Sequence, residues 1–314
     1  MTPAIRTTGL TKRYDGVPAV DGLDLTVERG ELYGFLGPNG AGKTTTIRMA
    51  LGLIHATSGE VEVLGEHVTT DRGPMRRVGA LVEEPAFWKY LSGRRNLEYF
   101  ARAGGRGEDT NRRLARLDEC LSLVGLGEAA NKRVKAYSQG MRQRLGIGLA
   151  LLGEPELLML DEPTNGLDPT GMREMRQLLR GLADRGTTVF VSSHLLSEVE
   201  AMCDRVGVMA QGRILAEGAP GTLRGAADRL RAEVDDVVRA TEIVRGLVGA
   251  TIADLGVPAR GAGAITVAMQ DGLTPADVNA ALVRAGVGVS ALVPVGNSLE
   301  DVFLHLVEGA DVPR

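Results

Sequence analysis

Residues 37–44 read GPNGAGKT, and this stretch decides the predicted fold. It matches the pattern G-x-x-x-x-G-K-[ST] at every fixed position, and the apolar segment from Glu31 to Leu36 precedes it as a predicted strand. Glycines allow backbone N–H groups to turn inward around phosphate groups, and the N-terminus of a following helix adds a favourable dipole. The stretch therefore predicts a phosphate-binding loop. For an isolated match, the alternative is a glycine-rich turn that happens to carry Lys-Thr.

The side chains of this loop suit a nucleoside triphosphate bound with Mg²⁺. Lys43 would bridge the β- and γ-phosphates, and the hydroxyl of Thr44 would ligate the metal ion. We expect a nucleoside triphosphate and Mg²⁺ as cofactors, with the triphosphate contacted along the whole loop. The predicted contacts are Gly37, Pro38, Asn39, Gly40, Ala41, Gly42, Lys43, Thr44 and Thr45.

A second stretch, residues 157–162 with the sequence LLMLDE, ends in two carboxylates. A buried strand of this kind in a parallel sheet would place Asp161 and Glu162 at the carboxyl edge, where ligands bind in such folds. Asp161 suits the shell of a Mg²⁺ ion, directly or through water. Glu162 suits a base that positions or deprotonates an attacking water. Taken alone, such a pair is more often a helix cap or a solvated turn.

Apolar periodicity divides the chain of 314 residues into two predicted domains. Strands and helices alternate through residues 1–218, which predicts a parallel sheet covered by helices. Residues from about 87 to 153 show helical spacing and are expected to be an inserted helical subdomain. Residues 219–314 read as strand, helix, two strands, helix, strand and a final helix, which predicts a small α+β domain. The predicted fold class is thus α/β, a P-loop core followed by a C-terminal α+β accessory domain.

Composition argues against several classes of function. A formal net charge of −4 argues against a nucleic-acid partner, because proteins that bind the phosphate backbone usually carry a basic excess. Cys120 and Cys203 lack metal-ligand spacing, so neither a disulfide scaffold nor a zinc site is expected. No stretch reaches the roughly 18 apolar residues of a membrane span, and the N-terminus lacks the apolar core of a signal peptide. If the protein acts at a membrane, we expect another protein to cross it.

Three further segments accompany the loop and the carboxylate pair: YSQGMRQR at residues 137–144, NGLDP at residues 165–169, and Ser193-His194. In this order and spacing, the chain from about residue 4 to 218 resembles a nucleotide-binding subunit of the ABC transporter family. The resemblance implies an ABC-type ATPase that hydrolyses ATP, because the loop lysine, both carboxylates and the histidine are present. It also implies a separate integral membrane permease and a second ATP-binding subunit, expected to be an identical copy. The chain would then lie at the cytoplasmic face of the cell membrane as a peripheral subunit.

The resemblance also assigns roles outside the loop. His194 would contact the γ-phosphate and hold the hydrolytic geometry beside Glu162, and Asp168, in the D-loop, would lie at the dimer interface. Tyr14 would stack on adenine, but a buried core tyrosine is a serious alternative. Without the other motifs, Ser138 would be a plain N-cap of the following helix. The resemblance implies a signature loop that would contact ATP of the partner subunit, made of Ser138, Gln139, Gly140 and Met141.

Departures from the family pattern point to one branch of the family. Glu83 occupies a position that is usually glutamine, and its carboxylate is expected to ligate Mg²⁺ as an amide oxygen would; the alternatives are stronger metal binding or, if the carboxylate is unpaired, repulsion of the γ-phosphate. Gln139 stands where the signature has glycine, and Met141 where it has glutamine. Together with the sequence Glu83-Glu84-Pro85, these features resemble exporters of peptide antibiotics and related toxic compounds. We therefore expect export of an antibiotic, drug or lipid-like compound, with an importer or a non-transport ABC ATPase as the alternatives.

Two sets of apolar residues could either pack in the core or form a surface that binds another protein. Residues 298–306, near the end of the tail, read SLEDVFLHL, which resembles the extension of drug-exporter-like subunits. Its apolar residues at helical spacing predict a core face packed on the sheet, with dimerisation as the alternative: Leu299, Val302, Phe303 and Leu306. Phe87, Trp88 and Tyr90 would suit a docking surface for the membrane partner if exposed, although buried packing is the default.

Overall fold

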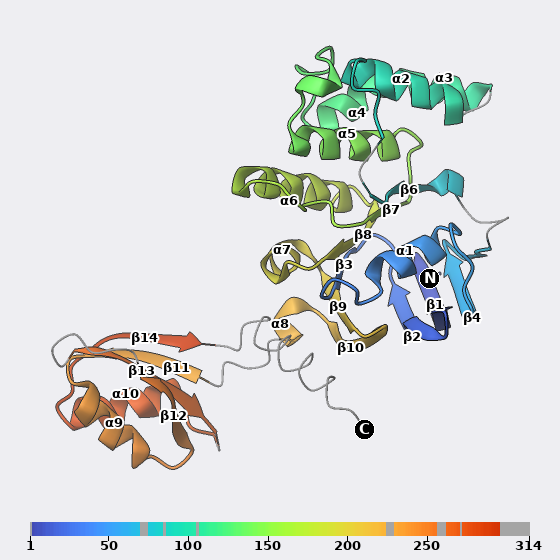
Figure 1. Cartoon of the computed structure of the whole chain (residues 1–314). Helices are drawn as coiled ribbons and strands as arrows, with labels where there is room; N and C mark the ends of the chain where they lie inside the picture. The colour runs from blue at the N-terminus through green and yellow to red at the C-terminus, as the bar shows by residue number, and fades with distance from the viewer. Residues whose placement is uncertain are drawn as a thin grey trace. The chain divides into compact units, whose positions relative to one another are not determined.

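The computed structural model describes residues 2–69, 75–83, 86–104, 107–223, 229–255, 262–270 and 272–295. These residues divide into two compact units, the first ending at Pro220 and the second beginning at Gly221 (Figure 1). Each unit has its own β-structure and its own buried core.

A six-stranded sheet organises the first unit. From edge to edge its strands are β10 (Arg213–Gly218), β9 (Arg205–Ala210), β3 (Leu32–Leu36), β8 (Thr188–Ser193), β7 (Leu157–Leu160) and β6 (Val78–Leu81). All neighbours pair in parallel except β10, which runs antiparallel to β9. Every residue of β3, β7 and β8 is buried, as expected for parallel strands covered on both faces. The segments that follow these three strands therefore meet at one edge of the sheet.

A second sheet is antiparallel and shares a core with the first. Its strands, in spatial order, are β2 (Val17–Val27), β1 (Ile5–Tyr14), β4 (Ser58–Val63) and β5 (Glu66–His67). Helix α1 (Lys43–Ala50) packs into the same core: Ile47 of the helix belongs to one buried cluster with Leu10 of β1 and Phe190 of β8. The helix that follows the phosphate-binding loop is thereby fixed between the two sheets.

The helical insertion lies in the sequence between β6 and β7, and its helices gather in a cluster of their own (Figure 1). They are α2 (Gly93–Gly104), α3 (Glu108–Ala115), α4 (Leu117–Leu123) and α5 (Gln139–Leu151). The spacing over residues 110–126 is helical throughout, but the structure divides this stretch at Arg116. The guanidinium of Arg116 donates to the carbonyl oxygen of Leu151, the last residue of α5, and this contact holds the chain at the turn.

Two more helices complete the strand–helix alternation of the first unit. Helix α6 (Pro169–Ala183) leads from β7 to β8, and α7 (Leu196–Met202) leads from β8 to β9. Helix α6 thus joins two neighbouring parallel strands, whereas α7 joins two parallel strands that have β3 between them. The α/β fold class predicted from the sequence is confirmed.

The aromatic residues that follow β6 are partly packed and partly exposed. Phe87 is buried, and the ring of Trp88 packs on Tyr99 of α2 with the ring centroids 4.3 Å apart. Tyr90 leaves 68% of its surface exposed, and Tyr99 leaves 52% exposed. Buried packing therefore describes Phe87, whereas Tyr90 and Tyr99 present aromatic surface to the solvent.

The second unit is a four-stranded antiparallel sheet with two helices on one face (Figure 1). After the short helix α8 (Pro220–Leu223), its elements in chain order are β11 (Arg229–Val234), α9 (Val237–Arg245), β12 (Ala250–Leu255), β13 (Gly263–Met269), α10 (Pro275–Arg284) and β14 (Val289–Val295). The strand order β14-β11-β13-β12 is that of a split β-α-β, ferredoxin-like motif. Its core joins Leu230 and Ile265 of the sheet to Leu282 of α10.

The predicted final helix, with Leu299, Val302, Phe303 and Leu306, lies outside the described residues, as do Glu84 and Pro85. The prediction that this helix packs on the sheet, and the alternative that it mediates dimerisation, therefore stay predictions. In the part of the chain that the structure describes, no helix combines the length and the apolar character needed to traverse a lipid bilayer.

Candidate functional site

The phosphate-binding loop joins the end of β3 to the start of α1. Gly42 immediately precedes the helix with a φ of 107°, a left-handed backbone that favours glycine. A Cβ atom at Gly37 would collide with the carbonyl oxygen of Met209, and a Cβ atom at Gly42 would collide with that of Ala19. Both glycines are therefore needed for the loop to pass this closely to β9 and β2.

The start of α1 is open to an anion. Among the described residues, no side chain caps this helix at Gly42, and the Gly42 carbonyl oxygen accepts its helical bond from the Thr46 amide. The amides of Lys43, Thr44 and Thr45 come before that bond, and first-turn amides need partners from outside the helix. Such a helix start favours phosphate oxygens. The loop therefore fits the phosphates of a nucleotide.

The ammonium group of Lys43 lies inside the loop. The side chain is only 6% exposed, and Nζ donates to the carbonyl oxygens of Gly37 at 2.6 Å and Pro38 at 3.2 Å. Nζ also lies 3.2 Å from Oε1 of Glu162. A buried charge is tolerated where it is paired and hydrogen-bonded in this way. Lys43 thus links the loop to the carboxylates that follow β7.

These carboxylates are held by contacts from two other elements. Thr44 Oγ1 donates to Oδ2 of Asp161 at 2.7 Å. The hydroxyl of Ser192, in β8, donates to Oδ1 of Asp161 at 2.6 Å and accepts the Glu162 amide at 3.0 Å. His194, which follows β8, places Nδ1 2.7 Å from Oε2 of Glu162. One edge of the sheet therefore brings together the loop lysine and threonine, both carboxylates and the histidine that the sequence singles out.

The backbone at Glu162 is strained. Its φ of 48° is left-handed, which is uncommon for a residue with a side chain. Such a conformation costs on the order of 1–3 kcal/mol and persists where the surrounding structure holds it. Here the holding contacts are the amide bond to Ser192 and the carboxylate contacts with Lys43 and His194. Strain of this kind clusters at active sites and ligand-binding segments.

Two oxygens of the site suit a Mg²⁺ ion that a nucleotide helps to bind. The described residues contain no group of three or more His, Cys, Asp or Glu side chains arranged to hold a metal ion. The adjacent oxygens of Thr44 and Asp161 nevertheless suit Mg²⁺, which usually takes one or two carboxylates and completes its shell with phosphates and water. Glu83, the third predicted ligand, has a left-handed backbone with a φ of 71°, and its carboxylate forms an ion pair with Arg48 of α1.

The predicted signature loop lies at a separate cavity. Ser138 accepts the Met141 amide at 3.2 Å and caps α5, which confirms that it serves as an N-cap. Residues 138–140 line a cavity of about 300 Å³ together with Asp168. The residues that line this cavity include none from the phosphate-binding loop. One copy of the chain therefore keeps Ser138 and Lys43 in different sites.

Gln139, at the position where the family signature has glycine, contacts the segment that contains Asp168. Its Nε2 donates to the carbonyl oxygen of Asn165 at 3.2 Å, and its side-chain amide lies against Gly166. Asp168 in turn caps α6, because its Oδ1 accepts the Gly171 amide at 2.9 Å. The side chain of Gln139 therefore ties the predicted signature loop, residues 138–141, to the predicted D-loop segment around Asp168 within one chain.

Tyr14 is 48% exposed, so the alternative of a buried core tyrosine is wrong. Lys12 Nζ lies 5.1 Å from the centroid of its ring, within the range of a cation–π contact. In the neighbouring strand β2, Val17 pairs with Tyr14, and Ala19 lies against the loop residue Gly42. The exposed ring therefore belongs to the hairpin that borders the phosphate-binding loop.

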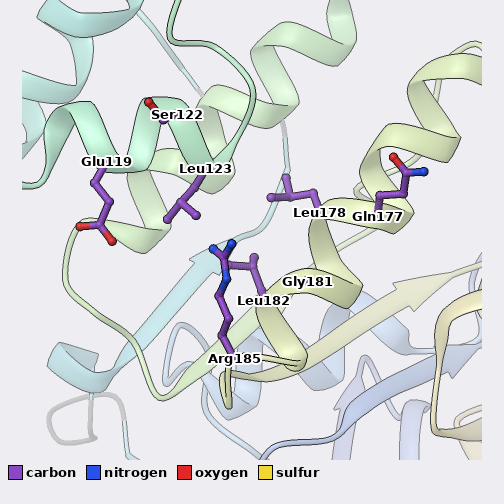
Figure 2. Close-up of a pocket in the computed structure, with 8 residues that line it drawn as sticks. All are labelled: Glu119, Ser122, Leu123, Gln177, Leu178, Gly181, Leu182 and Arg185. Carbon is purple, nitrogen blue, oxygen red and sulfur yellow. The ribbon is translucent and has the colours of Figure 1, made fainter.

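A second cavity contains none of the predicted site residues. It has a volume of about 390 Å³ and lies between α4 and α6. Leu123 and Leu178 line it together with the polar side chains of Glu119 and Arg185 (Figure 2). One wall thus comes from the helical insertion and the other from the helix that follows β7, so this cavity is distinct from the nucleotide site.

Two residues at the site carry contacts that sequence motifs do not reveal. Ser192 lies within β8, whose sequence is TVFVSS, and the only signal for it in the sequence is a hydroxyl two residues before His194 near the end of a buried strand. Arg48 lies one helical turn beyond Thr44, and from the sequence alone a basic residue there is expected simply to face the solvent. Its pairing with Glu83 follows from tertiary structure alone.

Comparison with known proteins agrees with this geometry. The ABC transporter family model matches residues 20–165. The bacitracin transport ATP-binding protein BcrA of Bacillus licheniformis is 50% identical over 219 residues, covering 69% of this chain and 70% of that protein. The daunorubicin/doxorubicin resistance ATP-binding protein DrrA of Streptomyces peucetius is 37% identical over 311 residues, covering 97% of this chain and 92% of that protein.

Two solved structures share the fold. The protein cbiO1 of Clostridium perfringens, part of the ABC transporter complex cbiONQ, is 29% identical, with a TM-score of 0.64 over 71% of this chain and 91% of that chain. A dimeric ATP-binding cassette in a post-hydrolysis state, bound to ADP and Pi, is 25% identical, with a TM-score of 0.60 over 68% of this chain and 98% of that chain. The motifs, the assembled site and these similarities together show that the chain belongs to the ABC transporter family, as an ATP-binding subunit that hydrolyses ATP.

Proposed function

We propose that this subunit powers the export of an antibiotic, drug or lipid-like compound through a separate transmembrane protein. Relatives named for bacitracin transport and for daunorubicin/doxorubicin resistance support the proposal. The sequence Glu83-Glu84-Pro85 and the altered signature loop support export in preference to import. The transported compound would be selected by the membrane protein, and this chain would supply the energy.

The observation that carries the catalytic part of the proposal is the cluster around Glu162. Glu162 would position or deprotonate the attacking water, and His194 would hold its carboxylate and contact the γ-phosphate. Lys43 would exchange its loop carbonyl partners for the β- and γ-phosphates. Thr44 and Asp161 would hold Mg²⁺, which supplies charge neutralisation to the phosphates when it is bound. The exposed ring of Tyr14 would stack on adenine.

A second, identical copy of the chain would complete the site. Ser138 is exposed at the N-terminus of α5, where its hydroxyl and the helix dipole suit a γ-phosphate. Residues 138–141 of one copy would face ATP bound to the phosphate-binding loop of the other, and Asp168 would lie at the interface. A relative of known structure that is dimeric with ADP and Pi bound supports this arrangement. Two ATP molecules would close the pair, and hydrolysis would open it.

These roles assign a separate function to each domain of the chain. Residues 1–218 would be the ATP-binding domain, with the helical subdomain at about residues 87–153, and residues 219–314 would be an accessory domain. The exposed rings of Tyr90 and Tyr99, beside Trp88, would contact the membrane protein. The subunit would thus work as a peripheral protein at the cytoplasmic face of the cell membrane, without a nucleic-acid partner.

Affinity isolation of the tagged chain from detergent-solubilised native membranes tests this proposal. We expect a polytopic membrane protein of an exporter class in stoichiometric amount. Tyr90→Ser should recover less of it, whereas Leu53→Ser should recover as much as the wild type, because Leu53 is similarly exposed, at 61%, and lies outside the aromatic group. A chain that stays without a membrane partner, even with ATP and Glu162→Gln to hold a closed dimer, would contradict the transport role.

A further inference from the structure

Ser192 is a buried hydroxyl near the carboxyl end of β8, after the apolar residues Val189, Phe190 and Val191 and before Ser193. All six residues of this strand are buried, and the exposed fraction of Ser192 is 0%. Strand β8 lies between β3 and β7, and its register pairs Val191 with Leu160, so Ser192 lies beside the residue that follows β7, Asp161. A hydroxyl buried in this way is costly unless it is hydrogen-bonded. The hydrogen-bond partners of Ser192 therefore explain why its hydroxyl is tolerated in the buried strand.

Both partners of Ser192 belong to the carboxylate pair. The hydroxyl donates to Oδ1 of Asp161 at 2.6 Å and accepts the amide of Glu162 at 3.0 Å. The other oxygen of Asp161 accepts from Thr44 at 2.7 Å. Asp161 is thus held from two elements, β8 and α1, and a single hydroxyl links its carboxylate to the backbone of the next residue.

The bond to the Glu162 amide acts on a strained backbone. The φ of 48° at Glu162 needs contacts that hold it, and the Ser192 hydroxyl is the one that holds the amide. This conformation places Oε2 of Glu162 2.7 Å from His194 and Oε1 3.2 Å from Lys43. Loss of the Ser192 hydroxyl would take away this partner of the amide and loosen the placement of both carboxylates.

We propose that Ser192 is a positioning residue for ATP hydrolysis, which fixes the backbone of Glu162 and the carboxylate of Asp161. The inference rests on the roles proposed above for these two residues. Ser192 acts through them and keeps its own proton throughout, since its hydroxyl only donates to Asp161 and accepts from an amide. Its removal should therefore change kcat and metal affinity and leave ATP binding largely unchanged.

Steady-state kinetics of Ser192→Ala, which removes only the hydroxyl, test the inference. We expect kcat to fall about ten- to hundredfold, because displacement of catalytic groups by about 1 Å can cost that much, and KM for ATP to stay within about twofold. Ser192→Thr, which keeps a hydroxyl, should recover most of kcat. The matched control is Thr188→Val at the opposite end of β8, where a buried hydroxyl accepts the Gly30 amide at 2.9 Å. This control should keep the kcat of the wild type even where its melting temperature falls as far as that of Ser192→Ala.

A binding measurement separates positioning from general damage to the fold. Electron paramagnetic resonance of Mn²⁺ in the presence of a non-hydrolysable ATP analogue reports the metal affinity directly. We expect Mn²⁺ to bind several-fold more weakly to Ser192→Ala, because Asp161 loses one of its two restraints, and with wild-type affinity to Thr188→Val. A folded Ser192→Ala variant with wild-type kcat and wild-type Mn²⁺ affinity would overturn the inference.

Two further comparisons keep the test decisive. If Ser192→Ala does not fold, Ser192→Thr and Ser192→Val are compared instead, because their side chains have similar volume and only threonine keeps a hydroxyl. The kcat of Ser192→Thr should be at least about tenfold higher than that of Ser192→Val. Equal kcat values would overturn the inference. Glu162→Gln is measured in parallel. Turnover that survives in Glu162→Gln removes the proposed role of Glu162, whereas an inactive Glu162→Gln beside a fully active Ser192→Ala removes the role of Ser192 alone.

Discussion

At the scale of single residues, Glu162 is held in the site by three contacts. Lys43 lies 3.2 Å from one carboxylate oxygen, His194 lies 2.7 Å from the other, and Ser192 accepts the backbone amide at 3.0 Å. Its left-handed backbone is kept by these contacts. A carboxylate held so firmly beside the phosphate-binding loop has the placement that a general base needs.

Glu162→Gln should abolish turnover and keep ATP binding. The amide retains the size of the side chain but cannot accept a proton from water, so we expect hydrolysis to fall about 10²- to 10⁴-fold. Phosphate release measures turnover, and titration with a fluorescent ATP analogue measures binding. Glu154→Gln is a matched control, because Glu154 also has a left-handed backbone, with a φ of 51°, and lies at the opposite end of β7. Unchanged phosphate release in Glu162→Gln would remove this residue from the role of base.

Residue patterns predict the parts of the site that are continuous in sequence. The loop at residues 37–44 and the pair Asp161-Glu162 follow buried strands directly, so strand topology alone brings them to one sheet edge. The ion pair of Glu83 with Arg48 could not be predicted in this way. This contact depends on how α1 packs beside the end of β6, and no local pattern contains that information.

At the scale of elements, α5 connects the signature loop to the rest of the unit. Ser138 caps its N-terminus, and Arg144 in its second turn lies 3.1 Å from Glu174 of α6. Helix α6 is capped in turn by Asp168, which lines the same cavity as Ser138. The starts of α5 and α6 therefore form one surface, and this surface is the part of the site that a second copy would use.

Ser138→Arg should leave ATP binding by a single chain intact and block hydrolysis by the pair. The larger cation would fill the position of the serine hydroxyl at the helix N-terminus, where the dipole already disfavours positive charge. We expect hydrolysis to fall at least tenfold at a protein concentration that gives full activity to the wild type. Ser122→Arg, at an exposed serine of α4, is the control. Normal hydrolysis by Ser138→Arg would mean that one chain suffices.

Ion pairs at the amino ends of the strands make stability depend on pH. Hydrogen bonds from Arg77, followed by those from Arg29, lower the pKa of Glu156 from 4.5 to about 2. A carboxyl group whose pKa is lower in the folded state stabilises the fold above pH 4.5, and this contribution is lost as the pH falls toward 2. The side chain is 43% exposed, so the network contributes about 1 kcal/mol or less.

Glu156→Gln should therefore lower the melting temperature by no more than roughly 2–4 °C at pH 7. The difference from the wild type should shrink between pH 4.5 and about pH 2. Thermal unfolding followed by circular dichroism across this range provides the measurement. Glu98→Gln, which breaks one exposed pair with Arg102 inside α2, is the control and should track the wild type. A difference that stayed constant down to pH 2 would contradict the assignment to Glu156.

At the scale of the whole molecule, periodicity predicts the architecture better than the connections within it. Alternation of strand and helix patterns predicts the α/β core and the α+β tail because each pattern reports which face of an element is buried. The order β14-β11-β13-β12 and the break at Arg116 depend on contacts between distant residues, which composition and spacing do not encode. The cavity lined by Ser138 and Asp168 would likewise acquire its proposed function only when a second molecule reaches it.

The molar mass of Glu162→Gln in solution, measured by light scattering with and without Mg²⁺ and ATP, tests most directly the claim that two copies build the site. We predict that ATP doubles the mass of Glu162→Gln and leaves the mass of Glu162→Gln/Ser138→Arg unchanged. A mass that stays that of one chain at saturating ATP, while the wild-type chain hydrolyses ATP at the same concentration, would contradict the composite site.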